Sequence, residues 1–258
     1  MFAELDGISL RYEDSGSGEP VILIAGFGAT HAYWGGMRRL LDGYRVVTLD
    51  NRGCGETVYN GAFSIDDLAD DVVLLADFLG IERFHVLGWS MGTQIAQSLG
   101  IRHGGRLKSI TLVSAYLWRP ARSAYLLNGY TKMAADGEAP TACLAMMVNA
   151  MSFPPSVFEK LEARGETMQI PRKLEDPKKM MMQLDAVNAY DTTELASGIQ
   201  VPTLLVHGRE DLMVPLPDGL AVAEKIPNCE TLVLDDAGHN ILPERYATEF
   251  REFIDSHS

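Results

Sequence analysis

The sequence predicts an α/β fold in which a mostly parallel sheet carries helices on both faces. Short apolar runs alternate along the chain with segments whose apolar residues recur at helical spacing, as expected for successive β-α-β units. One apolar run, Phe84–Leu87, leads through the glycine-flanked serine segment Gly88–Gly92 into a helix-forming stretch. The alternation stops once, over residues 116–190, where helical patterns occur without a convincing strand. These observations predict one α/β core that carries a helical insert.

The composition is typical of a folded protein and argues against two classes of partner. Of the 258 residues, 47% are hydrophobic, which is enough to bury a large core. The chain has 22 Lys and Arg against 35 Asp and Glu, a formal charge of -13, so we expect no nucleic-acid partner. No stretch reaches the roughly 18 apolar residues of a membrane span, so we expect none.

The cysteines and the start of the chain favour a cytoplasmic protein. Cys54, Cys143 and Cys229 lie far apart, without the paired spacing of a zinc site or a disulfide framework. We therefore expect reduced thiols and no bound metal. The first residues, Met1–Asp6, show no basic segment followed by an apolar run, so we expect no targeting leader.

The chain before the serine segment is expected to form a hairpin, two buried strands and two helices. Phe2–Tyr12 has alternating apolar residues on either side of an Asp-Gly pair, which is typical of a hairpin. The continuous apolar runs Val21–Ala25 and Tyr44–Leu49 indicate strands buried on both faces. A helix is predicted between these strands, and a second follows them. Ser64, with Asp67 three residues on, opens the second helix as a capping box.

The chain after the serine segment supplies the remaining strands. The run Ser109–Val113 precedes the insert, and the alternation resumes with the strand Thr203–His207. A helix over Leu220–Ile226, a strand over Thr231–Leu234 and a last helix from Pro243 to about Ser256 complete the predicted elements.

The segment Gly88–Gly92 has the G-x-S-x-G pattern of a nucleophile elbow, with Ser90 where a strand turns into a helix. The turn is so tight that the flanking residues must be small, a condition that Gly88 and Gly92 meet. It lifts the hydroxyl clear of the sheet and aims the first helical N–H groups at the reacting atom. Because a glycine-flanked serine also occurs in ordinary strand-to-helix turns, the remaining residues must decide between the two.

A serine hydroxyl needs a histidine to take its proton and a carboxylate to hold that histidine. Loops that leave the carboxyl ends of parallel strands lie at the same edge as the elbow, so partners are sought directly after strands. His239 follows the last strand and Asp211 follows the strand before it, in the chain order serine, acid, histidine. Nearby alternatives for the acid are Glu210, Asp235 and Asp236.

The other histidines are mostly expected to be structural. His85 and His207 lie inside strand runs, where a neutral, hydrogen-bonded histidine is usual, and His103 and His257 are expected to face solvent. His31 lies beside a glycine loop at the same edge as the elbow, so we keep it as a candidate substrate contact.

Stabilising a tetrahedral oxyanion takes two hydrogen-bond donors. We expect the backbone N–H of Met91, directly after the serine, and the backbone N–H of Phe27, in the loop Gly26–Gly28 after an early strand. The alternative is that these glycines serve only as turn formers.

With these motifs in place, the sequence resembles the α/β-hydrolase superfamily over nearly its whole length, with the insert the weakest part. The matching pieces are Gly26–Gly28, Asp50 with Arg52-Gly53 and Gly55, the elbow around Ser90, Gly208 with Asp211, and Gly238-His239. The resemblance implies an eight-stranded, mostly parallel α/β-hydrolase sheet with a Ser-His-Asp triad and a helical cap. The sequence is similar to small bacterial esterases, 3-oxoadipate enol-lactonases and the aminoacrylate hydrolase of pyrimidine breakdown. It departs at Ala25, where members of this branch often have a histidine, so the loop must be braced from elsewhere.

We expect residues 1–115 and 191–258 to form the core domain and residues 116–190 to form the cap. The cap leaves the sheet between the elbow strand's neighbour and the acid strand, so it would lie over the triad. Cap methionines and aromatics would line an adaptable apolar pocket or pack the cap onto the core. The candidate substrate contacts are Trp89, His31, Trp118, Met147 and Met151. Arg119 and Arg122 are either holders of a substrate carboxylate or solvated surface residues.

The hypothesis that follows is a cofactor-free serine hydrolase that cleaves a small to medium, partly apolar carboxylic ester or lactone through an acyl-enzyme. Ser90 at the elbow argues against epoxide hydrolases and haloalkane dehalogenases, which resemble this fold but place an aspartate there. The same triad would serve a thioesterase, a carbon-carbon bond hydrolase or a perhydrolase. A ligand-binding receptor with little turnover, or an enzyme that uses His239 as a base without an acyl-serine, are further alternatives. The oligomeric state is left open.

Overall fold

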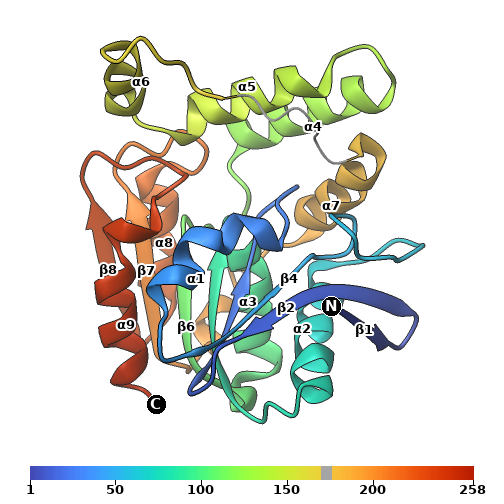
Figure 1. Ribbon diagram of the computed structural model, residues 1–258, viewed down its shortest axis with the longest axis vertical. Coiled ribbons are helices and arrows are strands. Elements are labelled where there is room, and N and C mark those ends of the chain that lie inside the picture. Colours follow the sequence, from blue (N-terminus) through green and yellow to red (C-terminus); the bar gives the residue numbers. More distant parts are fainter. Residues whose placement is uncertain (170–175) are drawn as a thin grey trace.

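The computed structural model describes residues 1–169 and 176–258, and an eight-stranded sheet lies at its centre (Figure 1). The strand order is β1-β2-β4-β3-β5-β6-β7-β8. The pairs β1-β2 and β2-β4 are antiparallel, and all other neighbours pair parallel. The predicted eight-stranded, mostly parallel sheet is confirmed. The strands are β1 Phe2–Leu5, β2 Ile8–Ser15, β3 Pro20–Ile24, β4 Arg45–Leu49, β5 Phe84–Trp89, β6 Leu107–Val113, β7 Thr203–Gly208 and β8 Cys229–Leu234.

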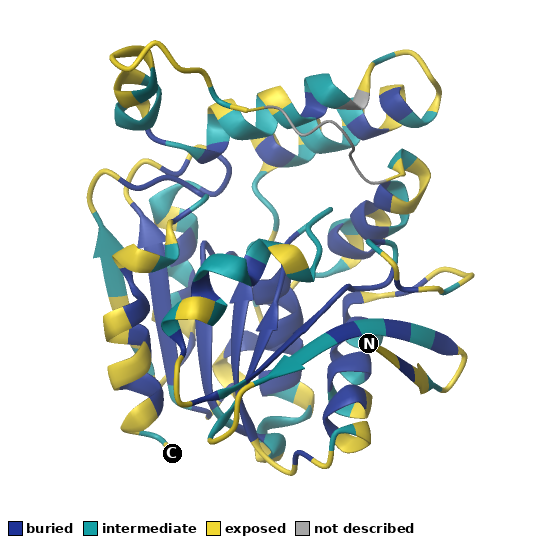
Figure 2. Cartoon of the chain, in the orientation of Figure 1, coloured by how far each residue is buried: buried dark blue, intermediate teal, exposed yellow. Residues whose placement is uncertain are grey.

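Helices cover both faces of the sheet, with a separate apolar core under each layer. Alternate strand residues enter opposite cores, because successive side chains of a strand point to opposite faces: in β5, Val86 lies in one core and Leu87 in the other. Figure 2 shows the central strands almost wholly buried, whereas β8 at the edge is partly exposed. One face carries α2 Ile65–Phe78, α3 Met91–Arg102 and α8 Leu216–Lys225, and the other carries α1 Gly35–Leu40 and α9 Ala247–Asp255.

The insert forms a helical cap beyond the carboxyl ends of the strands (Figure 1). Prolines mark where its helices begin, since a proline at the first position lacks only an N–H that the helix does not use. Pro120 and Pro140 directly precede α4 and α5, and Pro177 is the first residue of α7, while Pro171 lies outside the described residues. The cap helices are α4 Ala121–Ala135, α5 Thr141–Ser152, α6 Pro155–Glu162 and α7 Pro177–Ala189.

The last helix begins later than the sequence predicted. A 3-10 turn spans Pro243–Arg245, and α9 starts only at Ala247. Tyr246 between them has φ -144° and ψ 1°, outside the helical region, and its ring is buried in the core beside α1. The helix is thus interrupted at Tyr246, where the chain buries the aromatic ring. Within the described residues, no helix is long and apolar enough to cross a bilayer.

The junction of β5 and α3 is a sharp turn with Ser90 at its apex. Ser90 has φ 54° and ψ -119°, a strained conformation for a residue with a side chain. The strand and helix approach so closely that a Cβ on Gly88 would lie 2.2 Å from the carbonyl oxygen of Gly92. A Cβ on Gly92 would lie 2.3 Å from the carbonyl oxygen of Ile24 in β3. Both glycines are required by backbone contact.

We predict that Gly88→Ala destabilises the protein by at least about 2 kcal/mol, because its methyl group would overlap backbone atoms that have no room to move. Urea unfolding followed by circular dichroism measures this loss. The matched control is Gly129→Ala in α4, where nothing lies within 4 Å of the added methyl group. Alanine there should raise the free energy of unfolding by about 0.5 kcal/mol. Equal stabilities of the two variants would contradict the packing argument.

We also predict that His85 makes the fold sensitive to mild acid. His85 is fully buried in β5 with Nδ1 2.7 Å from Ser109 Oγ, and burial lowers its pKa from 6.5 to about 4. As the pH falls, His85 binds a proton in the unfolded chain before it does so in the folded protein. The stability that neutral His85 contributes is therefore complete above pH 6.5 and is lost as the pH falls towards 4. The loss amounts to about 3 kcal/mol.

The check is urea unfolding of the wild type and His85→Gln between pH 7 and pH 4. Glutamine is neutral throughout this range, so the variant should show a shallower decline in unfolding free energy. Parallel curves for the two proteins would contradict the assignment.

Candidate active site

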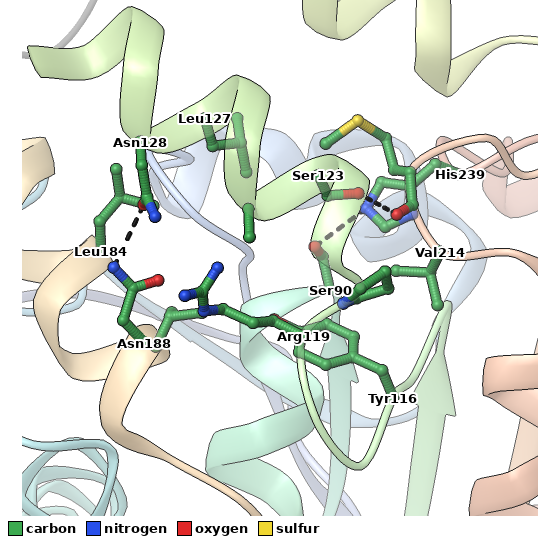
Figure 3. Close-up of a pocket in the computed structure, with 14 residues that line it drawn as sticks. Ser90, Tyr116, Arg119, Ser123, Leu127, Asn128, Leu184, Asn188, Val214 and His239 are labelled. Atoms are coloured by element: carbon green, nitrogen blue, oxygen red, sulfur yellow. Dashed lines mark hydrogen bonds between the residues drawn. The ribbon is translucent and has the colours of Figure 1, made fainter.

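Ser90, Asp211 and His239 meet at the carboxyl edge of the sheet. Ser90 follows β5, Asp211 lies in the loop after β7, and His239 lies in the loop after β8. His239 Nε2 lies 2.9 Å from Ser90 Oγ (Figure 3), and His239 Nδ1 lies 2.8 Å from Asp211 Oδ2. A hydroxyl, an imidazole and a carboxylate therefore form one hydrogen-bonded row.

Asp211 is buried, and the loop that carries it fixes its carboxylate. Asp211 Oδ1 accepts hydrogen bonds of 2.8 Å from the backbone N–H groups of Met213 and Val214, which leaves Oδ2 to face His239. His207 supports this loop, since its Nε2 lies 2.9 Å from the Val214 carbonyl oxygen. A carbonyl can only accept, so this ring nitrogen carries the proton. Burial lowers the pKa of His207 and favours this neutral form.

The other acidic residues near the triad face solvent. The Asp235 side chain is 82% exposed and pairs with Arg209, and Glu210 and Asp236 are exposed as well. None of the three is hydrogen-bonded to His239 in the described part of the structure. Of the four acidic candidates, the structure brings Asp211 to the histidine.

His239 is also fixed through its backbone. Its carbonyl oxygen accepts hydrogen bonds of 3.0 Å from both Trp89 Nε1 and Ser114 Oγ. The Trp89 ring in turn stacks on Tyr33 at a centroid distance of 4.1 Å and an interplanar angle of 9°. Tyr33 donates from its hydroxyl to Asn240 Oδ1 at 2.7 Å. The residue before Ser90 therefore helps to position the loop that carries the histidine.

The loop after β3 lies directly against Ser90. A Cβ on Gly26 would lie 3.0 Å from Ser90 Cβ, so any side chain there would displace the loop. Two of its N–H groups already have protein acceptors: Gly28 donates to Gln183 Oε1 at 2.9 Å, and Ala29 donates to the Gly26 carbonyl at 3.2 Å. Within the described residues, the Phe27 N–H has no acceptor, so it remains available to a ligand.

Gln183 braces this loop, and the sequence analysis did not find it. It lies on α7 of the cap, is fully buried, and donates from Nε2 to the Arg52 carbonyl oxygen at 2.9 Å while its Oε1 holds the Gly28 N–H. It therefore supplies the bracing that Ala25 cannot. The sequence does contain an indication, since Gln183 lies at helical spacing between the apolar residues Met180 and Val187 of the buried face.

Two adjoining cavities open at Ser90 and His239. The larger, of about 270 Å³, extends under α5 and α7 of the cap, and the smaller, of about 40 Å³, extends between α4 and α7 (Figure 3). In the described part of the chain, no three His, Cys, Asp or Glu side chains are grouped as a metal site requires. The larger cavity is lined mainly by apolar side chains, among them Phe27, Trp89, Leu127, Leu144, Val148 and Met180.

Of the five predicted substrate contacts, the described lining of these cavities includes only Trp89. His31 is held elsewhere, with Nδ1 2.7 Å from Asp50 Oδ1 in a polar cluster. Trp118 is 44% exposed at the surface. Met147 and Met151 lie on α5, but the face of that helix towards the cavity carries Leu144, Ala145, Val148 and Asn149. The helical period places Met147 on another side of α5, whereas Met151, seven residues after Leu144, lies on the side of Leu144 but outside the described lining.

Comparison with known proteins agrees with the fold. The family model described as "alpha/beta hydrolase fold" matches residues 19–246. A hydrolase from Pseudomonas putida, named for 2-hydroxy-6-oxononadienedioate and 2-hydroxy-6-oxononatrienedioate, is 30% identical and aligns with 92% of this chain and 86% of its own. The pimeloyl-[acyl-carrier protein] methyl ester esterase of Aeromonas hydrophila is 28% identical over 90% of this chain and 92% of its own.

A solved structure of a thermophilic esterase from Thermogutta terrifontis, with malate bound, superposes with a TM-score of 0.82. It is 25% identical, and the match covers 97% of this chain and 95% of the esterase. The strand order of the sheet, the matching family model and these relatives all indicate the same fold. This chain belongs to the α/β-hydrolase family of enzymes.

Proposed function

We propose that this protein is a cofactor-free serine hydrolase that cleaves a small to medium, partly apolar carboxylic ester or lactone through an acyl-enzyme. The observation that carries the proposal is the 2.9 Å contact between Ser90 Oγ and His239 Nε2 at the mouth of a largely apolar cavity of about 270 Å³. Two of the relatives are named as esterases, which supports the ester class.

In the first half of the reaction, Ser90 Oγ attacks the substrate carbonyl carbon while His239 Nε2 takes the hydroxyl proton. Asp211, held by two backbone N–H groups, stabilises the imidazolium that forms. The negative charge develops on the former carbonyl oxygen. We assign the N–H groups of Phe27 and Met91 to this oxyanion, because Met91 directly follows Ser90 and the loop that carries Phe27 lies against Ser90.

The tetrahedral intermediate collapses when its bond to the leaving oxygen breaks. His239 returns the proton to this oxygen, which leaves as an alcohol or, from a lactone, stays attached to the acyl chain as a hydroxyl group. Water then attacks the acyl-serine with His239 as the base, and the carboxylic acid is released. Residues 1–115 and 191–258 would supply this machinery as the core, and residues 116–190 would shape the substrate cavity as the cap.

The first test is covalent labelling of Ser90 with a fluorophosphonate, followed by intact-protein mass spectrometry. We predict a single adduct on the wild type and none on Ser90→Ala. Ester turnover by that variant should fall by about 10⁴-fold or more while the fold is kept. The matched control is Ser197→Ala, an exposed serine away from the cavity, which should label as the wild type does.

Either of two results would count against the acyl-enzyme route. Near-normal turnover by Ser90→Ala, with loss of turnover in His239→Ala, would favour a histidine base that acts without an acyl-serine. If the folded protein binds a ligand but shows neither a fluorophosphonate adduct nor turnover, the alternative of a ligand-binding receptor would be favoured. Turnover of short-chain esters, lactones and thioesters by the unlabelled wild type separates the remaining bond types.

The second test concerns Gln183. Removing its side chain frees the Gly28 N–H and loosens the loop that presents the Phe27 N–H. We therefore predict that Gln183→Ala slows phosphonylation of Ser90 by about tenfold or more, since the phosphonyl oxygen needs the same donors as the oxyanion. Gln169→Ala changes an exposed glutamine of the cap and should leave the rate unchanged. A wild-type rate in Gln183→Ala would refute the bracing role.

A further inference from the structure

The described lining of the smaller cavity at Ser90 includes the guanidinium of Arg119. Arg119 lies between β6 and α4, and its guanidinium extends across the cavity floor towards α7 (Figure 3). Its Nε is fully buried and has no hydrogen-bond acceptor among the described residues. A buried donor without an acceptor costs free energy, so a ligand oxygen that accepts a hydrogen bond from this N–H would be bound favourably.

Among the described residues, no carboxylate pairs with this charge. In the described structure Arg119 makes no ion pair, and its recorded ring contact is with Trp118, 5.6 Å from the ring centroid. Neither cavity is lined by a described Asp, Glu or Lys. The two oxygens of Asp211, the acid of the site, are taken up by His239 and by the backbone of Met213 and Val214. Within the described part of the chain, the guanidinium is therefore a cation without a paired carboxylate, in the cavity that Ser90 also lines.

The surroundings of Arg119 fit a small polar group at the end of an apolar substrate. Asn128 of α4 and Asn188 of α7 lie at the same end of the cavity, and Asn188 Nδ2 donates to Asn128 Oδ1 at 3.2 Å. Asn188 Oδ1 is buried and has no hydrogen-bond partner among the residues that the structure describes, so this end also holds a free acceptor. Apolar side chains of Leu127 and Leu184 form the walls. Polar recognition is thus concentrated in one corner.

The charge balance favours a carboxylate over a phosphate. One guanidinium neutralises one carboxylate and can hold both of its oxygens through two parallel N–H groups. A phosphate carries close to two negative charges, and in this half-buried corner the second charge would stay unpaired. The overall charge of -13 repels any anion, so a local cation is needed to admit one.

We propose that the substrate is an ester or lactone that carries a free carboxylate, and that Arg119 binds this carboxylate while Ser90 attacks the scissile carbonyl. The inference rests on the proposed hydrolase function, because it names the substrate class of that same site. Arg122, the second arginine near the start of the cap, is exposed and lies outside the described lining of both cavities.

The test compares mono-p-nitrophenyl esters of succinic, glutaric and adipic acid with the corresponding esters in which the free carboxyl is a carbamoyl group. The two members of each pair have the same shape and differ in charge. In the wild type, kcat/KM for the carboxylate ester should exceed that for its carbamoyl partner by about tenfold or more at the best chain length. The ratio within each protein cancels any effect of a variant that is common to both esters.

The variants assign this preference to one side chain. Arg119→Met keeps length without charge and should bring the ratio to about one. Arg119→Lys keeps the charge without the planar fork and should give an intermediate ratio. Arg122→Met is the matched control and should keep the wild-type ratio. Thermal unfolding of all variants verifies that they are folded.

Two outcomes would overturn the inference while leaving the hydrolase intact: equal rates for both members of every pair in the wild type, or a preference that survives in Arg119→Met. Absence of turnover of every ester, together with absence of a fluorophosphonate adduct, would instead show that the proposed function itself is wrong, and the inference would fall with it.

Discussion

The site depends on the close backbone contact between β5, α3 and β3. Because Gly88 and Gly92 have no side chains, the strand can turn into the helix within a few residues, and Ser90 is left at φ 54°. Such a conformation persists only where the surrounding structure holds it, and here both β5 and α3 are buried along almost their whole length. The strained residue thereby presents its hydroxyl to His239 and the helix N-terminus to the same space.

The cap is joined to this machinery as well as lying over it. Gln183 of α7 holds the Gly28 N–H of the loop beside Ser90. At the other end of the cap, the carbonyl oxygen of Ser152 accepts a 2.9 Å hydrogen bond from the backbone N–H of Asn240, next to His239. The two loops on either side of Ser90 are therefore both tied to cap helices. A shift of these helices would reach the proposed oxyanion donors and the histidine as well as the substrate cavity.

The fold could be predicted because strand and helix periods are local properties of the sequence. Ser90, Asp211 and His239 could be placed near one another because each follows a parallel strand, and the carboxyl ends of such strands share an edge. The substrate contacts could not be placed in this way. Helix α5 carries apolar residues on most sides, so its sequence does not show that Leu144 and Val148, rather than Met147 and Met151, line the cavity. His31 is held by Asp50 and not in the described cavity lining, and this contact joins two segments that are separate in the sequence. Gln183 was indicated only by a polar residue within an apolar stripe.

The most direct measurement of the central claim is acid quenching during steady turnover of p-nitrophenyl acetate, followed by digestion and peptide mass mapping. The account predicts an acetyl group on the peptide that contains Ser90, and no acetyl group on the corresponding peptide of Ser90→Ala. Rapid turnover with no acylated peptide at any quench time, or an acetyl group on a different residue, would contradict it.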